Sequence, residues 1–252
     1  MKTKTRMNKE LTLIEHLGEL RKRIFQYFLG LILIFFGCSF FAKQIAEYIF
    51  LPYYKYLPDP SFKLAYTGIA DVFIFYFKMV GVVSIFLSAP WLFWQFWLFI
   101  SPALRKKEKK LAIPFMAVTS LLLMGGMLFA YFIVLPLTFR FFFELNKDYR
   151  NVVTISSIWN FELAMIIAVG FSFETPILIF ILNYLRIVTI KFLVKNIRWA
   201  ILIAFVVSAV ITPSGDPFTQ TVVALPIVVL YLMGILLSLI IPSSKKEEKD
   251  EK

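Results

Sequence analysis

The sequence has little of the chemistry that soluble enzymes use. Among its 252 residues there is one cysteine, Cys38, and one histidine, His16. A single cysteine excludes an intramolecular disulfide, and a lone histidine with no second histidine or cysteine near it does not predict a metal site. No glycine-rich phosphate loop followed by Lys-Ser or Lys-Thr is present, which excludes nucleotide binding by that motif. We therefore expect no cofactor.

Charge is also scarce, because only 17% of the residues are charged and 60% are hydrophobic. This composition excludes an ordinary soluble domain. The first apolar run, residues 24–41, is too long for the hydrophobic part of a cleavable signal peptide, and no small-residue cleavage site follows it. We expect it to remain as a signal-anchor helix. The excess of Lys and Arg is spread over the loops, so we expect no nucleic-acid partner.

The apolar pattern predicts an all-α membrane protein of one domain with six spanning helices. The expected spans are 24–42, 72–99, 111–135, 161–183, 199–212 and 221–241. Residues 12–23 are predicted to form an amphipathic surface helix, with Thr12 and Glu15 as its capping box. The mixed-charge tail, residues 243–252, is predicted to be disordered. Turns or kinks are predicted at Pro52, Pro90, Pro176, Pro213 and Asp216.

The loops differ strongly in positive charge. Twenty of the 27 Lys and Arg residues fall in the two termini and in the loops after the second and fourth predicted spans, whereas the opposite loops hold six. The remaining one, Lys78, lies inside the second span. Because positive loops stay on the cytoplasmic side, we expect both termini to be cytoplasmic.

Glu174 is the most informative residue of the predicted spans. It stands in the apolar run 164–182, where translocon-based scales assign a charged side chain roughly +2.5 to 3.5 kcal/mol. Pro176 is expected to bend the helix beside it. This placement predicts a protonation, ion or partner-docking site. The alternative is a neutral carboxyl with a structural role only.

Two other glutamates lie on the basic side. Glu19 precedes Arg23 by four residues, and such a pair contributes about 0.2–0.5 kcal/mol. Glu108 is the single carboxylate among the five cations of residues 101–110. Both suit bidentate binding of a guanidinium group. The alternative is that each is held by its own basic neighbours, and spacing alone does not choose.

These residues, in this order, make the chain resemble TatC, the multi-spanning core of the twin-arginine protein translocase. The resemblance covers residues 12–241. It is carried by six motifs in register: 16–23 (HLGELRKR), 88–90 (SAP), 97–104 (WLFISPAL), 129–136 (FAYFIVLP), 171–176 (FSFETP) and the turn 212–226. One departure is Leu232, which stands where many relatives carry an acidic residue.

The resemblance implies a concave, glove-like bundle in the bacterial cytoplasmic membrane, without enzymatic activity, that receives the twin-arginine signal peptides of folded exported proteins. It implies that Glu19 and Glu108 accept the paired arginines, with Arg21 and Phe99 beside them. It further implies that Glu174 and Gln220 dock the single-span subunits TatA and TatB, that the chain self-associates among membrane lipids, and that the proton-motive force supplies the energy.

Two other classes of membrane protein are considered. A proton-coupled secondary transporter would use Glu174 as proton carrier and Lys78 as counter-charge, although no convincing internal repeat is visible. A membrane enzyme acting on lipid or isoprenoid phosphates would need a cluster of nucleophile, base or metal ligands.

Overall fold

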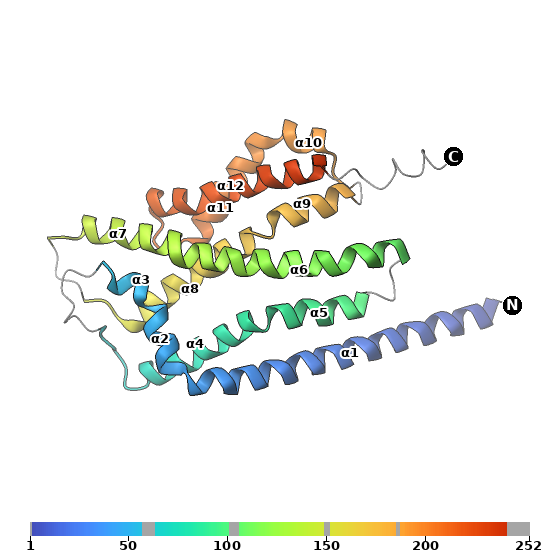
Figure 1. Ribbon diagram of the computed structural model, residues 1–252, viewed down its shortest axis with the longest axis horizontal. Helices are drawn as coiled ribbons and strands as arrows, with labels where there is room; N and C mark the ends of the chain where they lie inside the picture. Colours follow the sequence, from blue (N-terminus) through green and yellow to red (C-terminus); the bar gives the residue numbers. More distant parts are fainter. Residues whose placement is uncertain (1, 57–63, 101–105, 149–151, 185–186, 241–252) are drawn as a thin grey trace. The chain divides into compact units, whose positions relative to one another are not determined.

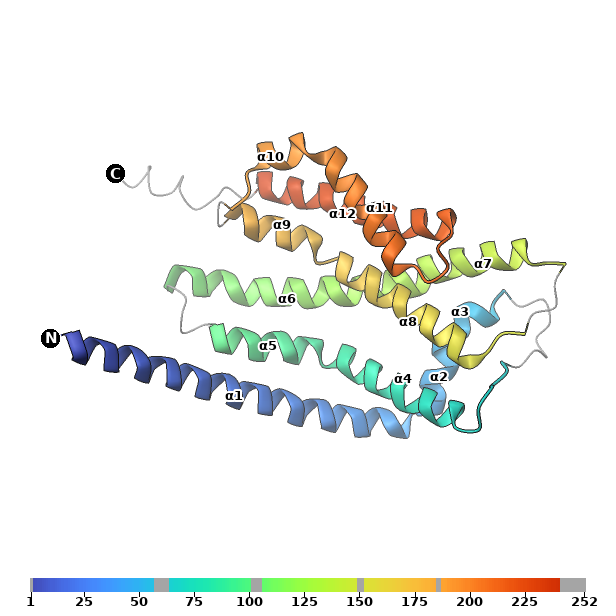
Figure 2. The same cartoon turned by 180° about the vertical axis from the view of Figure 1, so that it is seen from behind.

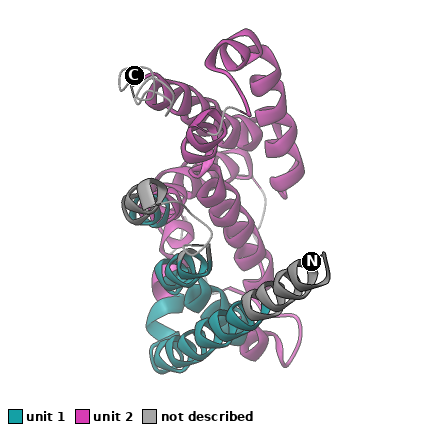
Figure 3. Ribbon diagram, turned by 90° about the vertical axis from the view of Figure 1, so that its right-hand side faces the viewer, with its two compact units in different colours: residues 1–46, 76–120 teal, residues 47–75, 121–252 magenta. Residues whose placement is uncertain are grey.

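The computed structural model describes residues 2–56, 64–100, 106–148, 152–184 and 187–240; the side chains of 2–16, 97, 100, 106–115 and 240 lie outside this description. The chain divides into two compact units (Figure 3). Unit 1 comprises residues 1–46 and 76–120, and unit 2 comprises residues 47–75 and 121–252.

The described residues are helical apart from turns, short connections and one isolated parallel bridge between Ala65 and Thr154, which confirms the all-α prediction (Figure 1). The helices are α1 (Lys2–Phe40), α2 (Ala42–Ile49), α3 (Leu51–Tyr54), α4 (Asp71–Leu87), α5 (Ala89–Ile100), α6 (Lys106–Phe129), the π-helical η2 (Ala130–Val134), α7 (Leu135–Leu145), α8 (Ile155–Ser172), α9 (Thr175–Tyr184), α10 (Ile190–Lys195), α11 (Ile197–Ile211) and α12 (Pro217–Ile240).

Length and apolar composition identify the candidate membrane spans. Within the described residues, four stretches qualify alone: Leu17–Phe40, Met116–Leu145, Ile155–Tyr184 and Pro217–Leu239. The bent pair α4 and α5 makes a fifth if it is counted as one span, whereas α11 has only 15 residues. The chain is thus a membrane protein with several apolar helices, and the count of six spans stays a prediction.

The first helix differs from the prediction. α1 is continuous from Lys2 to Phe40, so residues 12–23 do not form a separate surface helix. Thr12 lies inside α1, where backbone donors already have partners in the preceding turn, and the predicted capping box with Glu15 is wrong. The physical reason is that no proline interrupts residues 2–40, so the ladder of backbone hydrogen bonds continues from the polar part into the apolar part.

The predicted second span is two helices. The helix axis bends by 49° between α4 and α5, at Ser88. Pro90, in the first turn of α5, has no N–H to donate to the preceding turn, which favours a bend at this point. In unit 1 the bend packs on α1, because the Tyr27 hydroxyl lies 3.1 Å from Ser88 Oγ and Trp91 Nε1 donates to the Gln26 carbonyl at 3.4 Å.

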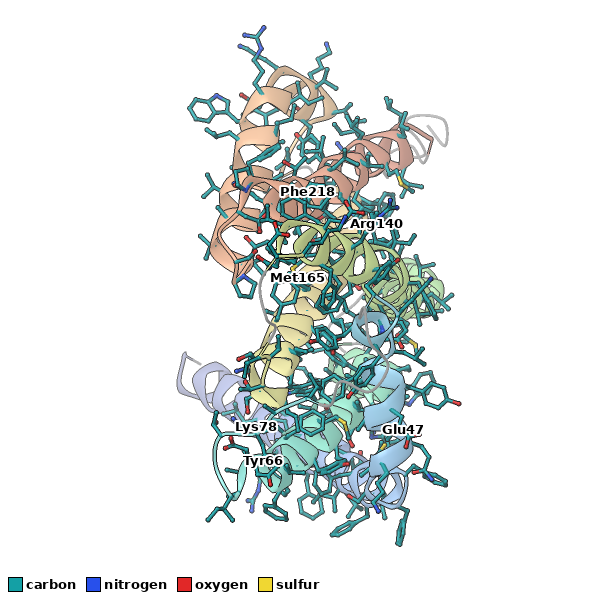
Figure 4. All side chains as sticks on the ribbon, turned by 90° about the vertical axis from the view of Figure 1, so that its left-hand side faces the viewer. Glu47, Tyr66, Lys78, Arg140, Met165 and Phe218 are labelled. Atoms are coloured by element: carbon teal, nitrogen blue, oxygen red, sulfur yellow. The ribbon has the colours of Figure 1, made fainter. Side chains whose placement is uncertain are left out.

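Unit 2 is built around α12. This helix packs against α9 and α11 (Figures 1 and 2), and the Phe218 ring stacks on Phe141 of α7 with centroids 4.2 Å apart. α8 packs against η2, α11 and α12, with the Met165 side chain wholly buried (Figure 4). Nearer the start of α8, Trp159 packs edge-on against Phe75.

Six hydroxyl groups in these helices bond to their own helix. Each donates to the carbonyl four residues earlier at 2.6–2.9 Å, as seen for Ser39, Ser84, Thr138, Ser172, Thr221 and Ser238. The hydroxyls of Thr119 and Thr219, in contrast, are buried without a hydrogen-bond partner among the described residues. Because lipid offers no replacement partner, an internal bond of this kind removes the cost of a buried hydroxyl. Two carboxyl groups of unit 2, Glu162 and Glu174, have buried oxygen atoms with no hydrogen-bond partner among the described residues, and they lead to the candidate sites.

Candidate functional site

Glu19 lies on α1 and is already paired. Arg23 Nη2 donates to Glu19 Oε1 at 3.2 Å, which confirms the pair expected from the four-residue spacing. The Glu19 side chain keeps 31% of its surface exposed. An exposed pair of this type contributes only about 0.3–0.5 kcal/mol. A second guanidinium that binds more strongly can therefore displace Arg23 from Glu19, or share the Glu19 carboxylate with Arg23.

Arg21 and Phe99 occupy different surroundings. Arg21 is exposed on α1, two residues from Glu19, so the two side chains leave the helix on different faces. Arg21 borders a shallow hollow of about 470 Å³ whose other walls include Ile24 and Phe25. Phe99 is half-buried on α5, the helix that packs against α1 in unit 1.

Glu108 lies in the first turn of α6, and its side chain is outside the described part of the chain. Carboxylates are favoured near a helix N-terminus by the exposed backbone donors and the helix dipole. That Glu108 and Glu19 act together stays a prediction.

Glu174 lies in the break between α8 and α9. Its backbone N–H donates to the Phe171 carbonyl at 3.1 Å, and its own carbonyl accepts from Leu178 at 3.0 Å. The side chain is half-buried, and its Oε1 is buried with no hydrogen-bond partner among the described residues. Pro176 is buried in the first turn of α9, where its missing N–H costs nothing. The chain thus holds an unsatisfied carboxyl oxygen within an apolar segment.

An apolar groove in unit 2 lies next to the break that holds Glu174, and Glu174 itself is not among its lining residues. Ser172 and Thr175 form one wall of a hollow of about 510 Å³ in unit 2. Phe192 of α10, Trp199 of α11 and Tyr231 of α12 contribute to the other walls. Tyr231 is held in place because its hydroxyl donates to the Leu193 carbonyl at 3.0 Å. The groove is thus largely apolar, and Glu174 belongs to the short segment that joins two of its lining residues, Ser172 and Thr175.

Gln220 has its amide nitrogen engaged within the chain. Nε2 donates to the Phe205 carbonyl at 2.9 Å, and the Gln220 carbonyl accepts from Ser208 Oγ at 2.5 Å. These bonds join the start of α12 to α11. No hydrogen bond between Gln220 and Glu174 is found among the described contacts, so the two predicted docking residues are not brought into one polar cluster.

The turn between α11 and α12 is organised by Asp216. Its Oδ1 accepts from the Thr219 backbone N–H at 2.8 Å, which caps α12, and its Oδ2 accepts from Ser214 Oγ at 2.5 Å. Burial alone raises the pKa of this carboxyl, but the hydrogen bonds from Ser214 and Thr219 outweigh it, so the pKa is lowered. Gly215 has φ +61°, a conformation that side chains disfavour. Pro213 is the first residue of this exposed turn.

Pro52, another proline predicted to mark a turn or kink, lies buried in the first turn of α3.

The prediction missed one buried carboxyl, Glu162. Its side chain is 0% exposed, and neither carboxyl oxygen has a hydrogen-bond partner among the described residues. The predicted span began at residue 161, which put Glu162 at the edge of the membrane. α8 begins at Ile155 instead, so Glu162 lies two turns inside the helix. The signal was present in the sequence as a glutamate followed by an unbroken apolar run.

Metal chemistry has no support in the part of the chain that the structure describes. No three His, Cys, Asp or Glu side chains come together there as metal ligands would. Lys78, the counter-charge in the transporter hypothesis, is exposed on α4 (Figure 4).

Comparisons with known proteins agree on one family. The family model described as Sec-independent protein translocase protein (TatC) matches residues 15–226. The chain is 33% identical to TatC of Koribacter versatilis, covering 96% of this chain and 90% of the relative, and 39% identical to TatC of Escherichia coli K12, covering 90% and 87%. A solved structure, the twin arginine translocase receptor TatC, has a TM-score of 0.75 at 32% identity and covers 89% of this chain and 98% of that one. None of these matches supports the alternative of a proton-coupled secondary transporter.

Proposed function

Because this chain belongs to the TatC family of Sec-independent protein translocase components, we propose that it is the receptor that binds twin-arginine signal peptides. The observation that carries the proposal is its likeness to a solved twin arginine translocase receptor along 98% of that chain. Folded proteins bearing such signals are then the cargo, and the bacterial cytoplasmic membrane is the location. Both termini lie on the cytoplasmic side, on the argument from positive loops.

In this proposal the two arginines of the signal bind Glu19 and Glu108. Charge-assisted hydrogen bonds contribute about 1.5–3 kcal/mol each, which exceeds the about 0.3–0.5 kcal/mol of the existing Glu19–Arg23 pair. The incoming guanidinium is therefore the stronger partner for Glu19. The family resemblance gives Arg21 and Phe99 supporting positions, and the hollow beside Arg21 suits the apolar segment that follows the arginines in a signal peptide.

The test is a binding measurement on the purified full-length protein in lipid nanodiscs. A twin-arginine peptide is expected to bind more tightly than a twin-lysine peptide of otherwise identical sequence, because lysine keeps the charge but lacks the planar fork that matches a carboxylate. Equal affinity of the two peptides would mean hydrophobic adsorption and would overturn the receptor proposal.

The groove of unit 2 supports a proposal for the partner subunits. We propose that the single membrane helix of TatA or TatB lies in this groove with a polar side chain hydrogen-bonded to Glu174, since the groove is apolar and Glu174 Oε1 has no partner within the described chain. Self-association in the receptor complex and contact with lipid belong to the same proposal. The proton-motive force drives transport, in keeping with the absence of a phosphate-binding loop from the sequence.

Replacing Glu174 tests the docking site. Interhelical hydrogen bonds in membranes contribute about 0.6–2 kcal/mol, so Glu174→Ala is expected to lower partner binding by roughly 3- to 30-fold. Glu174→Gln retains hydrogen-bonding capacity and is expected to keep most of the binding. Site-specific cross-linking from groove residue Thr175 to the partner helix measures partner binding in each variant. Glu47→Ala, which removes a glutamate outside the groove, is the control. Normal cross-linking and export by Glu174→Ala would exclude the docking role.

A further inference from the structure

The most unusual polar group in unit 2 is Glu162. The Thr138 hydroxyl of α7 and the Ser172 hydroxyl of α8 bond to their own backbone, whereas both Glu162 oxygens are buried without a hydrogen-bond partner among the described residues. The residue is 0% exposed and lies on α8 between the buried Trp159 and Met165. A buried polar group without a partner costs free energy, so its retention calls for a reason beyond packing.

Two phenols lie within electrostatic reach of Glu162: Tyr131 of η2, the segment that packs against α8, and Tyr54 of α3. Burial raises the pKa of the Tyr54 hydroxyl, and a Glu162 carboxylate, when ionised, raises it further. The other helices packed on α8 add little, because α11 and α12 carry only Arg198 and Tyr231 as titratable residues. The Tyr231 hydroxyl is engaged at the Leu193 carbonyl, and Arg198 is exposed.

This environment suits a neutral carboxyl. An ionised carboxylate removed from water without a counter-charge is far costlier than a neutral one, and no ion pair to Glu162 is found among the described residues. The buried arrangement therefore fits the protonated acid. Ionisation requires either water or a new hydrogen-bond donor at the same place.

The Tyr131 hydroxyl is a candidate for this donor, because η2 packs against α8. The Tyr131 hydroxyl now donates to the Tyr48 carbonyl. Tyr131 lies in η2, a single π-helical segment between α6 and α7. Segments of this kind interrupt the regular ladder and occur frequently at functional sites. A change of η2 from π to α geometry rotates Tyr131 about the helix axis, which alters its bond to Tyr48.

We propose that Glu162 is a proton-binding site of unit 2, occupied in the buried arrangement and emptied when the Tyr131 hydroxyl turns from the Tyr48 carbonyl to the Glu162 carboxylate. On release, the O–H bond of the carboxyl breaks, the electron pair stays on oxygen and the proton passes to water at the end of the bundle where α3 lies. The site is defined by the residues of unit 2 alone, and its use in energy coupling rests on the proposed function.

Infrared difference spectroscopy of the full-length protein in nanodiscs tests the site directly. A protonated carboxylic acid has a C=O stretch that an ionised carboxylate lacks. At neutral pH this band is expected in the wild type, lost in Glu162→Gln and retained in Glu144→Gln, which removes an exposed glutamate. The Glu174→Gln variant identifies any C=O band that Glu174 contributes, so that this band is not assigned to Glu162. Labelling the wild type with ¹³C-glutamate assigns the band to glutamate even if the Glu162 variant folds poorly.

Absence of a glutamic-acid band from the wild type, or an unchanged spectrum in folded Glu162→Gln, would overturn the proposal. Tyr131→Phe removes the proposed donor and is expected to keep the band to a higher pH than the wild type; an unchanged pH response would contradict the role of Tyr131. Glu162→Gln is also expected to bind the twin-arginine peptide normally while its export loses dependence on the pH gradient. Failure of the wild type to bind that peptide would refute the receptor function and leave the infrared result standing.

Discussion

Replacing Glu19 and Glu108 together by glutamine is expected to weaken binding of a twin-arginine peptide by about 100-fold or more. Each carboxylate offers a charge-assisted hydrogen bond of about 1.5–3 kcal/mol, and each 1.4 kcal/mol corresponds to about tenfold in affinity. Glutamine preserves size and leaves one acceptor oxygen but removes the charge. Isothermal titration in nanodiscs, with twin-arginine and twin-lysine peptides, measures the loss and shows whether discrimination between them disappears.

A matched control is available within the chain. Glu144 accepts from Arg140 Nε at 3.1 Å with the same four-residue spacing as Glu19 and Arg23, in the reverse order and at a more exposed position. Glu144→Gln therefore removes an equivalent helical ion pair away from the proposed site and is expected to leave peptide affinity unchanged. If the double variant binds as tightly as the wild type, the acceptor assignment of Glu19 and Glu108 is wrong.

The second large effect concerns the contact between α9 and α12. A Cβ atom added at Gly234 would lie 3.0 Å from Pro176 Cα and 2.9 Å from Ile179 Cδ1. The Pro176 atom belongs to the backbone and cannot turn aside as a side chain can. Gly234→Val is therefore expected to destabilise the protein by about 1–3 kcal/mol or more, because overfilling a packed interior displaces backbone. Thermal unfolding in detergent measures this change.

Gly125 provides the comparison, since a Cβ atom added there meets nothing within 4 Å. Gly125→Ala is expected to be neutral or stabilising by up to about 1 kcal/mol, because alanine restricts the unfolded chain. Since Pro176 is two residues from Glu174, Gly234→Val should also reduce cross-linking of a partner helix to Thr175. Equal stability of Gly234→Val and the wild type would show that α9 and α12 separate without cost.

Several features of the protein follow from local sequence. The long apolar runs predict membrane helices because a bilayer demands about 20 apolar residues for each crossing. The pair between Glu19 and Arg23 follows from helical spacing, which places residues four apart on one face. Six motifs in register, among them residues 16–23 and 171–176, indicated the TatC family, which the family model confirms.

Other features depend on contacts between segments that are distant in the sequence, and these contacts could not be predicted from local pattern. Whether the chain breaks before residue 24 could not be predicted from amphipathic spacing, and α1 continues through it because nothing removes a backbone hydrogen bond there. The groove beside Glu174 takes walls from α10, α11 and α12, so no single segment encodes it. The amide of Gln220 is engaged by a carbonyl 15 residues away in the chain.

Glu162 shows most clearly what the sequence determines and what only the tertiary structure determines. By itself the sequence determined that this glutamate borders an apolar run. Only the tertiary structure decided that α8 begins earlier, that η2 and α3 bring phenols to the carboxyl, and that no basic residue in the described chain reaches it. Hydrophobic length and spacing are properties of one segment, whereas the burial of a carboxyl depends on which distant helices pack around it.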